Sequence, residues 1–342
     1  MNRRSTLHRW LATAALAAGT LASPAHAAFT SLTIFGDSLS DSGNNALVIG
    51  ANGGQVITGN TYIPTQPYAF SAYTNQFTWV NSFAAGLGLP TGAVPSLAGG
   101  RNFAFGGART SINGSVGNFP PSATTQLNQF LGTPGTLPAS ALFVIAIGGN
   151  DVRAAAETAA ADPSNAISII TAGAASFAAG VGNMVDALQA RGAQNIVVWS
   201  APNVGRSPFA IATNTVASAT FVSNSFNSAL NIRLTGESGV IPFNVSALID
   251  TVASNPGTYG LTNVSDACGA VMGCNPSQYL FWDAIHPTSA GHALLANAML
   301  AAVPEPSAVL LMVAGLFAVG LRARRVAMAA TSAASPAALP PR

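Results

Sequence analysis

Short apolar runs alternate along this chain with longer segments whose apolar residues recur at helical spacing. The clearest run, residues 141–147, is apolar at every position and ends at Gly148. A strand that is apolar on both faces is typical of the interior of a parallel sheet. Alternating strands and helices form right-handed βαβ units, with helices covering both faces of the sheet. The chain is therefore expected to fold as an α/β domain.

Five strands and five helices are expected from this pattern. The strands span residues 32–35, 102–105, 141–147, 196–199 and 240–243. The helices span residues 76–86, 126–131, 164–190, 218–234 and 288–299, and Thr288 is the expected N-cap of the last helix.

A long loop is expected after the first strand. Residues 44–60 are rich in glycine and asparagine, and the aromatic residues Tyr62, Tyr68, Phe70 and Tyr73 follow. Long loops in compact domains are often functional, so this segment is predicted to cover the site. The alternative is a surface loop with solvent-facing aromatic side chains.

The N-terminus has the pattern of a secretory signal peptide. Three arginines precede an apolar core at residues 10–21, and the small-x-small triplet Ala25-His26-Ala27 follows. Residues 1–27 are therefore predicted to be removed by signal peptidase. An N-terminal membrane anchor is less favoured, because the apolar core is short for a membrane span.

The C-terminus is also distinct. Residues 303–306 (VPEP) lead into an apolar run at 308–321, followed by Arg322, Arg324 and Arg325. The run is shorter than the ~20 residues of a usual membrane span, and a basic cluster after it suits a cytoplasmic stop. The segment 303–325 resembles the PEP-CTERM sorting signal of Gram-negative bacteria. The resemblance implies an exported protein, held at the inner membrane until an exosortase cleaves it and sends it to the cell surface or beyond.

Residues 326–342 extend past that pattern. They are rich in alanine and proline and are expected to be disordered. Between the two ends, residues 28–302 are long enough for one α/β domain. This domain has six arginines against ten acidic residues, which argues against a nucleic-acid partner because that would need a basic face.

The chain has two cysteines, Cys268 and Cys274. In an exported protein, this close spacing suggests a small disulfide loop. A metal site is not expected, because two thiols without a nearby histidine fall short of a zinc ligand set.

One serine follows the first expected strand. Residues 31–44 read SLTIFGDSLSDSGN, so Asp37 and Ser38 come at the carboxyl end of the strand, where open α/β sheets bind ligands. A Gly-Asp-Ser triplet alone is most often a turn. A nucleophilic role for Ser38 needs a base, an orienting acid and oxyanion donors elsewhere in the chain.

A base and an acid occur together near the C-terminus of the domain. His286 lies in a loop before the last expected helix, and Asp283 precedes it by three residues. Imidazole is the usual base for a serine hydroxyl, and a carboxylate on its second nitrogen fixes the tautomer. His292 lies inside the helix, where a surface or packing role is expected.

Oxyanion donors are expected after two other strands. The N–H of Gly107 and the side-chain amide of Asn150 could join the N–H of Ser38 in stabilising a negatively charged oxygen. The alternatives are an ordinary turn glycine and an ordinary turn amide.

Four motifs occur together in one order: FGDSLSDSGN, NFAFGGA, GGND and DAIHP. In this order and spacing the chain resembles the GDSL family of SGNH hydrolases, most closely its lipase, phospholipase and hemolysin-like branch. The resemblance covers about residues 33–302. It places the family's four letters on Ser38, Gly107, Asn150 and His286, with Asp283 as the third member of the triad.

The resemblance also implies a fold and secondary roles. The fold would be a flavodoxin-like three-layer α/β/α sandwich around a mainly five-stranded parallel sheet. Asp37 and Asp151 would brace their loops, and Arg153 would be structural rather than substrate-binding. No cofactor or metal is implied.

The leading hypothesis is therefore an exported serine esterase or lipase that works through an acyl-enzyme. Transfer of the acyl group to an alcohol would instead make it an acyltransferase, and a non-catalytic extracellular matrix protein is a further alternative. The substrate could be a lipid or an acetylated polysaccharide.

Overall fold

The computed structural model describes residues 29–49, 68–69 and 71–303, together with residues 315, 316, 318, 319 and 322. Residues 29–303 form one compact unit. The predicted signal peptide, the extension 326–342 and the aromatic residues Tyr62 and Phe70 lie outside the described residues.

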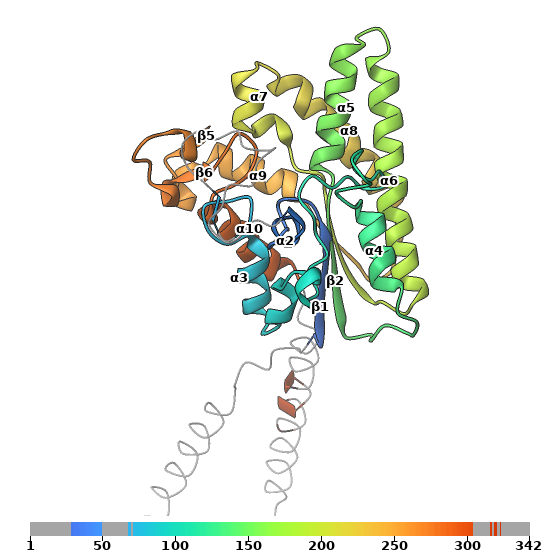
Figure 1. Ribbon diagram of the computed structural model, residues 1–342. Coiled ribbons are helices and arrows are strands. Elements are labelled where there is room, and N and C mark those ends of the chain that lie inside the picture. Colours follow the sequence, from blue (N-terminus) through green and yellow to red (C-terminus); the bar gives the residue numbers. More distant parts are fainter. Residues whose placement is uncertain are drawn as a thin grey trace, which may run out of the picture. The chain divides into compact units, whose positions relative to one another are not determined.

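The compact unit is built on a four-stranded parallel sheet (Figure 1). Its strands are β1 (Ser31–Gly36), β2 (Ala141–Ala146), β3 (Asn195–Trp199) and β4 (Val240–Phe243), hydrogen-bonded in that order. All three pairings are parallel. The expected α/β class and four of the five expected strands are confirmed.

The fifth expected strand, residues 102–105, is wrong. This segment runs beside β1 and makes three backbone hydrogen bonds with it: Ile34 N to Arg101 O, Phe103 N to Ile34 O, and Phe105 N to Gly36 O. On its outer side, Asn44 Nδ2 donates to the carbonyls of Asn102 and Ala104, and Asn102 also exchanges backbone hydrogen bonds with Val94 and Ser96. The segment is therefore an irregular edge, although counting it reproduces the flavodoxin-like order 2-1-3-4-5.

Helices cover both faces of the sheet in three layers (Figure 1). One face carries α4 (Ala123–Leu131), α5 (Gly149–Ala161), α6 (Ala166–Ala190) and α8 (Val216–Arg233), and the other carries α3 (Trp79–Gly86), α9 (Val245–Ser254) and α10 (Ser289–Ala302). Alternate residues of β2 serve the two sides: Phe143 belongs to the first apolar cluster and Leu142 to the second. This explains why the run 141–147 is apolar throughout.

Several elements were not expected from the sequence. They are α2 (Asn44–Ile49), α5, α7 (Pro208–Ala212), α9 and a two-stranded parallel sheet of β5 (Asn263–Ala267) and β6 (Tyr279–Phe281). Short 3₁₀ turns span Pro90–Ala93, Ser96–Ala98, Val204–Arg206, Pro256–Tyr259, Cys268–Ala270 and Pro276–Gln278.

The starts of two helices compare with the sequence-based predictions in different ways: the N-cap of α10 was predicted, and the start of α2 was not. Thr288 is the N-cap of α10, and its side chain accepts a hydrogen bond from Gly291 N, as expected. The helix α2 begins within the stretch expected to be a loop, because Asp41 Oδ1 accepts from the N–H groups of Gly43 and Asn44. A buried carboxylate thus satisfies free donors at the start of a short helix.

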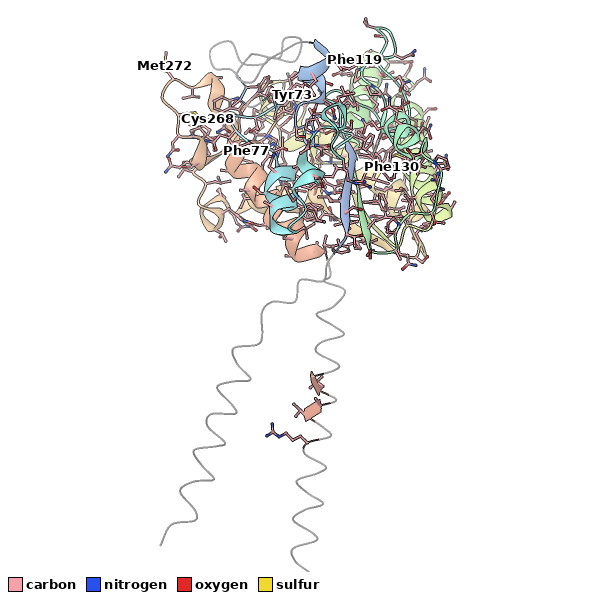
Figure 2. The ribbon with its side chains drawn as sticks, turned by 60° about the horizontal axis from the view of Figure 1, so that its bottom comes forward. Tyr73, Phe77, Phe119, Phe130, Cys268 and Met272 are labelled. Carbon is pink, nitrogen blue, oxygen red and sulfur yellow. A yellow bond between two sulfur atoms is a disulfide. The ribbon has the colours of Figure 1, made fainter. Side chains whose placement is uncertain are left out.

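The described part of the aromatic segment is buried. Tyr68 and Tyr73 pack with Ala46, Cys268 and Trp282 in one apolar cluster. The solvent-facing alternative is therefore wrong for these two tyrosines. Figure 2 labels Tyr73 inside the unit, near Cys268.

Among the described helices, only α6 is long and apolar enough to cross a membrane. Its apolar character has a second explanation, because Phe177, Val181 and Val185 pack in the core beside the sheet.

Candidate active site

Ser38 sits on a tight turn at the carboxyl end of β1. The turn begins at Gly36, where a Cβ atom would lie 2.6 Å from the carbonyl oxygen of Ala146 on the neighbouring strand. The carbonyl of Asp37 then accepts hydrogen bonds from the N–H groups of Ser40 and Asp41. Only glycine allows this close approach of two strands. The turn that follows places the Ser38 hydroxyl at the carboxyl ends of the parallel strands.

Ser38, His286 and Asp283 form one continuous hydrogen-bonded series. His286 Nε2 lies 2.8 Å from Ser38 Oγ, and His286 Nδ1 lies 2.6 Å from Asp283 Oδ2. The serine is 7 % exposed, the histidine 2 % and the aspartate 0 %. The three side chains that the sequence singled out therefore meet in a nearly dry site, although Ser38 and His286 are 248 positions apart.

Asp283 is held by donors on both oxygens. Its Oδ1 accepts from the backbone N–H groups of Ile285 and His286, and its Oδ2 accepts from Tyr68 Oη at 2.5 Å. Burial raises the pKa of Asp283, but the charge of His286 and these hydrogen bonds outweigh burial and hold the pKa below its usual value. The carboxylate is therefore ionised at neutral pH and can orient the imidazole.

Two of the three expected oxyanion donors line the same cavity as His286. This cavity of about 70 Å³ includes Ser38 and Asn150 in its wall, whereas Gly107 is not among its lining residues. Gly107 has φ +80°, a conformation that favours glycine. Asn150 Nδ2 donates to the carbonyl of Ala108 at 2.9 Å, which ties the start of α5 to the loop that contains Gly107.

Within the described residues, the backbone N–H groups of Ser38 and Gly107 donate to no other protein group. A free N–H in a buried turn is available to an incoming oxygen. One hydrogen of the Asn150 amide is used by Ala108, and the second remains for a ligand.

The two aspartates expected to brace loops are both buried. Asp151 accepts from the N–H and the hydroxyl of Thr110, and Asp37 Oδ1 accepts from Leu39 N. Burial raises the pKa of both carboxyls, that of Asp37 to about 7. Arg153 lies in the wall of the cavity.

Asp41 is a residue that the sequence reasoning missed. Besides capping α2, it accepts from Gly106 N at 2.9 Å, so it connects the Ser38 turn to the glycine loop. Burial raises its pKa to about 6 against several backbone hydrogen bonds that lower it. Asp41 lies within the SDSGN stretch of the first motif, and this position could have marked it as a candidate site residue.

His292 is buried, and neither ring nitrogen has a hydrogen-bond partner among the described residues. Burial lowers the pKa of His292 to about 3, so the ring is neutral. A packing role inside the protein fits this environment, and a surface role does not.

Cys268 and Cys274 are joined in a disulfide. Cys268 packs beside Tyr68 and Trp282, and the loop between the cysteines exposes Met272 at its tip (Figure 2). Within the described part of the chain, no group of three or more His, Cys, Asp or Glu side chains could hold a metal ion.

Fold and site together define a three-layer α/β protein with a serine-hydrolase-like arrangement at the carboxyl ends of its parallel strands. The chain belongs to the GDSL-like lipase/acylhydrolase family, whose model matches residues 32–299. The PEP-CTERM protein-sorting motif matches residues 302–325. Both resemblances noted in the sequence are thereby confirmed.

Curated relatives include esterases and a hemolysin. Esterase EstA of Pseudomonas aeruginosa is 29% identical over 312 residues, covering 79% of this chain and 46% of the relative. GDSL esterase/lipase 7 of Arabidopsis thaliana is 28% identical, covering 77% of this chain and 85% of the relative. The thermolabile hemolysin of Vibrio parahaemolyticus is 24% identical, covering 78% and 62%. The chain spans about half the length of the first of these relatives.

Among solved structures, Est24, a carbohydrate acetylesterase from Sinorhizobium meliloti, matches with a TM-score of 0.41 at 16% identity. The match covers 79% of this chain and 95% of that one.

Proposed function

We propose that the protein hydrolyses carboxylic esters with Ser38 as nucleophile, His286 as general base and acid, and Asp283 as the orienting acid. The observation that carries this proposal is the continuous series from Ser38 Oγ through His286 to Asp283, at 2.8 and 2.6 Å. Because Nδ1 donates to the ionised Asp283, Nε2 is the unprotonated nitrogen and can accept the serine proton.

Acylation starts when Ser38 Oγ attacks the ester carbonyl and His286 Nε2 takes the hydroxyl proton. The carbonyl oxygen becomes negative, and the N–H groups of Ser38 and Gly107 and the Asn150 amide are proposed to donate to it. Loss of one such donor costs about 2.7–4 kcal/mol of transition-state stabilisation. His286 then protonates the leaving alcohol, and the acyl group stays on Ser38.

Deacylation repeats these steps with water. His286 Nε2 takes a proton from a water molecule, the resulting hydroxide attacks the acyl-enzyme, and the proton returns to Ser38 Oγ as the carboxylic acid leaves. The ester and one water molecule are the only reactants besides the enzyme's own groups, and both half-reactions balance with them.

The proposed place of action is outside the cytoplasm. The signal-peptide pattern at residues 1–27 and the sorting motif at 302–325 support export, retention at the inner membrane through the C-terminal segment, and release by an exosortase.

The test compares initial rates on p-nitrophenyl esters, from acetyl to palmitoyl, for the wild type, Ser38→Ala and Ser42→Ala. The Ser42 hydroxyl donates to the carbonyl of Ala93 and does not touch His286, so it is a matched control in the same turn. We expect Ser38→Ala to lose turnover and Ser42→Ala to keep it. Folded wild type without activity on any ester, or an active Ser38→Ala, would overturn the proposal. In the first case, an added alcohol acceptor would test for acyl transfer.

A further inference from the structure

A second cavity of about 370 Å³ lies between the helical pairs α5–α6 and α7–α8. In Figure 1, α5 and α7 lie in the upper part of the unit, and α6 runs along its right side. Most of the side chains that line the cavity are apolar, among them Ala156, Ala160, Ile170, Phe209, Phe221 and Val222. The walls are therefore suited to a hydrocarbon group.

This cavity adjoins the one that contains Ser38. Arg153, Val204, Ser207 and Ile285 line both cavities, and we call these four residues the neck. Ile285 directly precedes His286, and its N–H donates to Asp283. The neck therefore lies immediately beside the catalytic series.

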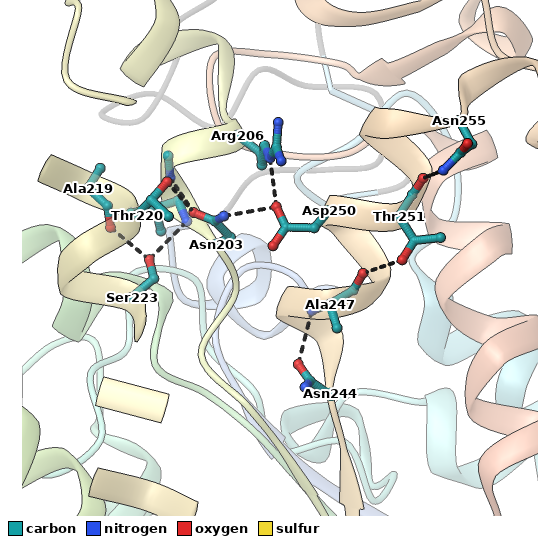
Figure 3. A network of polar contacts seen from close by, with 12 residues as sticks. Asn203, Arg206, Ala219, Thr220, Ser223, Asn244, Ala247, Asp250, Thr251 and Asn255 are labelled. Carbon is teal, nitrogen blue, oxygen red and sulfur yellow. Dashed lines mark hydrogen bonds and ion pairs between the residues drawn. The ribbon is translucent and has the colours of Figure 1, made fainter. Parts of the chain in front are cut away.

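One side of the neck is fixed by a polar network (Figure 3). Asp250 Oδ1 accepts from Asn203 Nδ2 at 2.9 Å and from Arg206 Nε at 2.6 Å. Ser223 Oγ accepts from Val204 N, which ties the neck to α8. The segment that contains Val204 is thus anchored on both α8 and α9.

The two cavities differ in what they can hold. The 70 Å³ around Ser38 suffices for the reacting ester and a short acyl group, whereas ligand pockets usually run from about 300 to 1,000 Å³. The second cavity falls within that range. A long acyl chain that is attached to Ser38 and extends toward the neck would reach apolar surroundings of this size.

Two aromatic side chains of the second cavity reach the surface. Phe209 and Phe221 line the cavity and remain 38 % and 51 % exposed. Aromatic side chains that lie partly in the wall and partly at the surface offer apolar contacts to a hydrocarbon group.

We propose that this second cavity binds the acyl chain of the substrate, so that the enzyme acts on esters of medium- and long-chain fatty acids. The proposal rests on the proposed esterase function and names its substrate class. Each methylene group buried in the cavity should favour binding roughly fourfold. An acetylated polysaccharide would leave the cavity empty and gain nothing from its walls.

The test replaces small residues of α5 that line the second cavity with large ones, so that the cavity becomes narrower. Ala156 and Ala160 are one helical turn apart and both line it. The full-length variants Ala156→Phe and Ala160→Trp are compared with the control Ala179→Phe, an exposed position on α6 outside the cavity. Ala160 is exposed, so its replacement also tests the idea if Ala156→Phe fails to fold.

We expect kcat/KM for dodecanoyl and palmitoyl esters to fall at least about tenfold in both cavity variants, with acetyl ester hydrolysis within about twofold of wild type. The control should keep the wild-type profile. Equal loss on all chain lengths, unchanged long-chain rates, or a wild-type optimum at acetyl would overturn the proposal.

A binding experiment separates this proposal from the esterase function. Ser38→Ala is titrated with a fluorescent long-chain fatty acid, alone and combined with Ala160→Trp. Binding that the second substitution weakens at least about tenfold supports the acyl site even if no ester is hydrolysed. Binding that is absent, or unaffected by that substitution, overturns it even if esterase activity is present.

Discussion

The hydroxyl of Tyr68 donates to Asp283 Oδ2 at 2.5 Å, and that same oxygen accepts from His286 Nδ1 at 2.6 Å. Tyr68 and Asp283 are 215 positions apart in the sequence and both are buried. A hydrogen bond to a charged group contributes about 1.5–3 kcal/mol. Tyr68 is therefore a positioning residue that holds the carboxylate in place behind the imidazole.

Replacing Tyr68 with Phe removes this hydroxyl while keeping the ring. We expect kcat to fall about tenfold with KM within about twofold, because a less well-held carboxylate affects the imidazole in the transition state more than it affects substrate binding. Steady-state kinetics on one soluble ester measures both values.

Tyr73→Phe is the matched control for that experiment. The Tyr73 ring lies 5.2 Å from the His286 ring, but its hydroxyl accepts from Asn45 Nδ2 and does not touch the triad. Its kcat should stay near wild type. Equal losses in the two variants would show that Tyr68 matters only for packing.

Asp37 should make stability depend on pH. Burial raises the pKa of Asp37 from 3.8 to about 7, so in this window the folded state holds a proton that the unfolded state has released. Stability therefore falls as pH rises from about 4 to above 7, by up to roughly 4 kcal/mol from this group. Asp37→Asn cannot ionise, and its stability relative to wild type should increase across this window.

Urea unfolding at several pH values between about 4.5 and 8.5 measures that difference. The control is Asp162→Asn, an exposed carboxyl whose pKa is lowered by hydrogen bonds from Asn165 and Ser164 and which stays ionised throughout. The difference in free energy of unfolding between Asp162→Asn and wild type should not change with pH. A flat difference for Asp37→Asn as well would contradict the raised pKa.

The close approach of β1 and β2 predicts that Gly36 tolerates no side chain. Gly36→Ala would place a Cβ atom 2.6 Å from the carbonyl of Ala146, and backbone cannot move aside cheaply. We expect a loss of about 1–3 kcal/mol in the free energy of unfolding, measured by denaturant titration.

Gly257→Ala is the corresponding control, because nothing lies within 4 Å of the position that its Cβ atom would take, and its φ is ordinary. This variant should stay within about 0.5 kcal/mol of wild type. If Gly36→Ala were equally harmless, the strand contact would not be the reason for glycine there.

The disulfide should stabilise the apolar cluster that contains Tyr68, Cys268 and Trp282. Closing so short a loop contributes about 2 kcal/mol by the chain-entropy account, and Cys268 also packs against Tyr68 and Trp282. A thermal unfolding scan should show a lower Tm after reduction of the wild type. The double variant Cys268→Ala, Cys274→Ala should have a lower Tm than the oxidised wild type and no response to reductant; a response would mean that the reductant acts elsewhere.

Local patterns in the sequence suffice to predict the α/β class and the positions of four strands, whereas the flavodoxin-like fold was implied by the family resemblance. Apolar runs mark buried strands, and parallel strands bring their carboxyl ends to one edge of the sheet. Ser38 and Asn150 could therefore be expected to lie close together, the family resemblance added His286 to them, and Thr288 could be identified as a cap.

Features that depend on partners far apart in the chain emerge only in the folded protein. Residues 102–105 form an irregular edge rather than a strand, and their outer groups are paired with the side chain of Asn44 and with the backbone of residues 94–96. Tyr68 acquires its role only from contact with Asp283. The second cavity is lined by residues of α5, α6, α7 and α8 together with Val204 and Ile285, and this combination of distant segments is visible in no local stretch of residues.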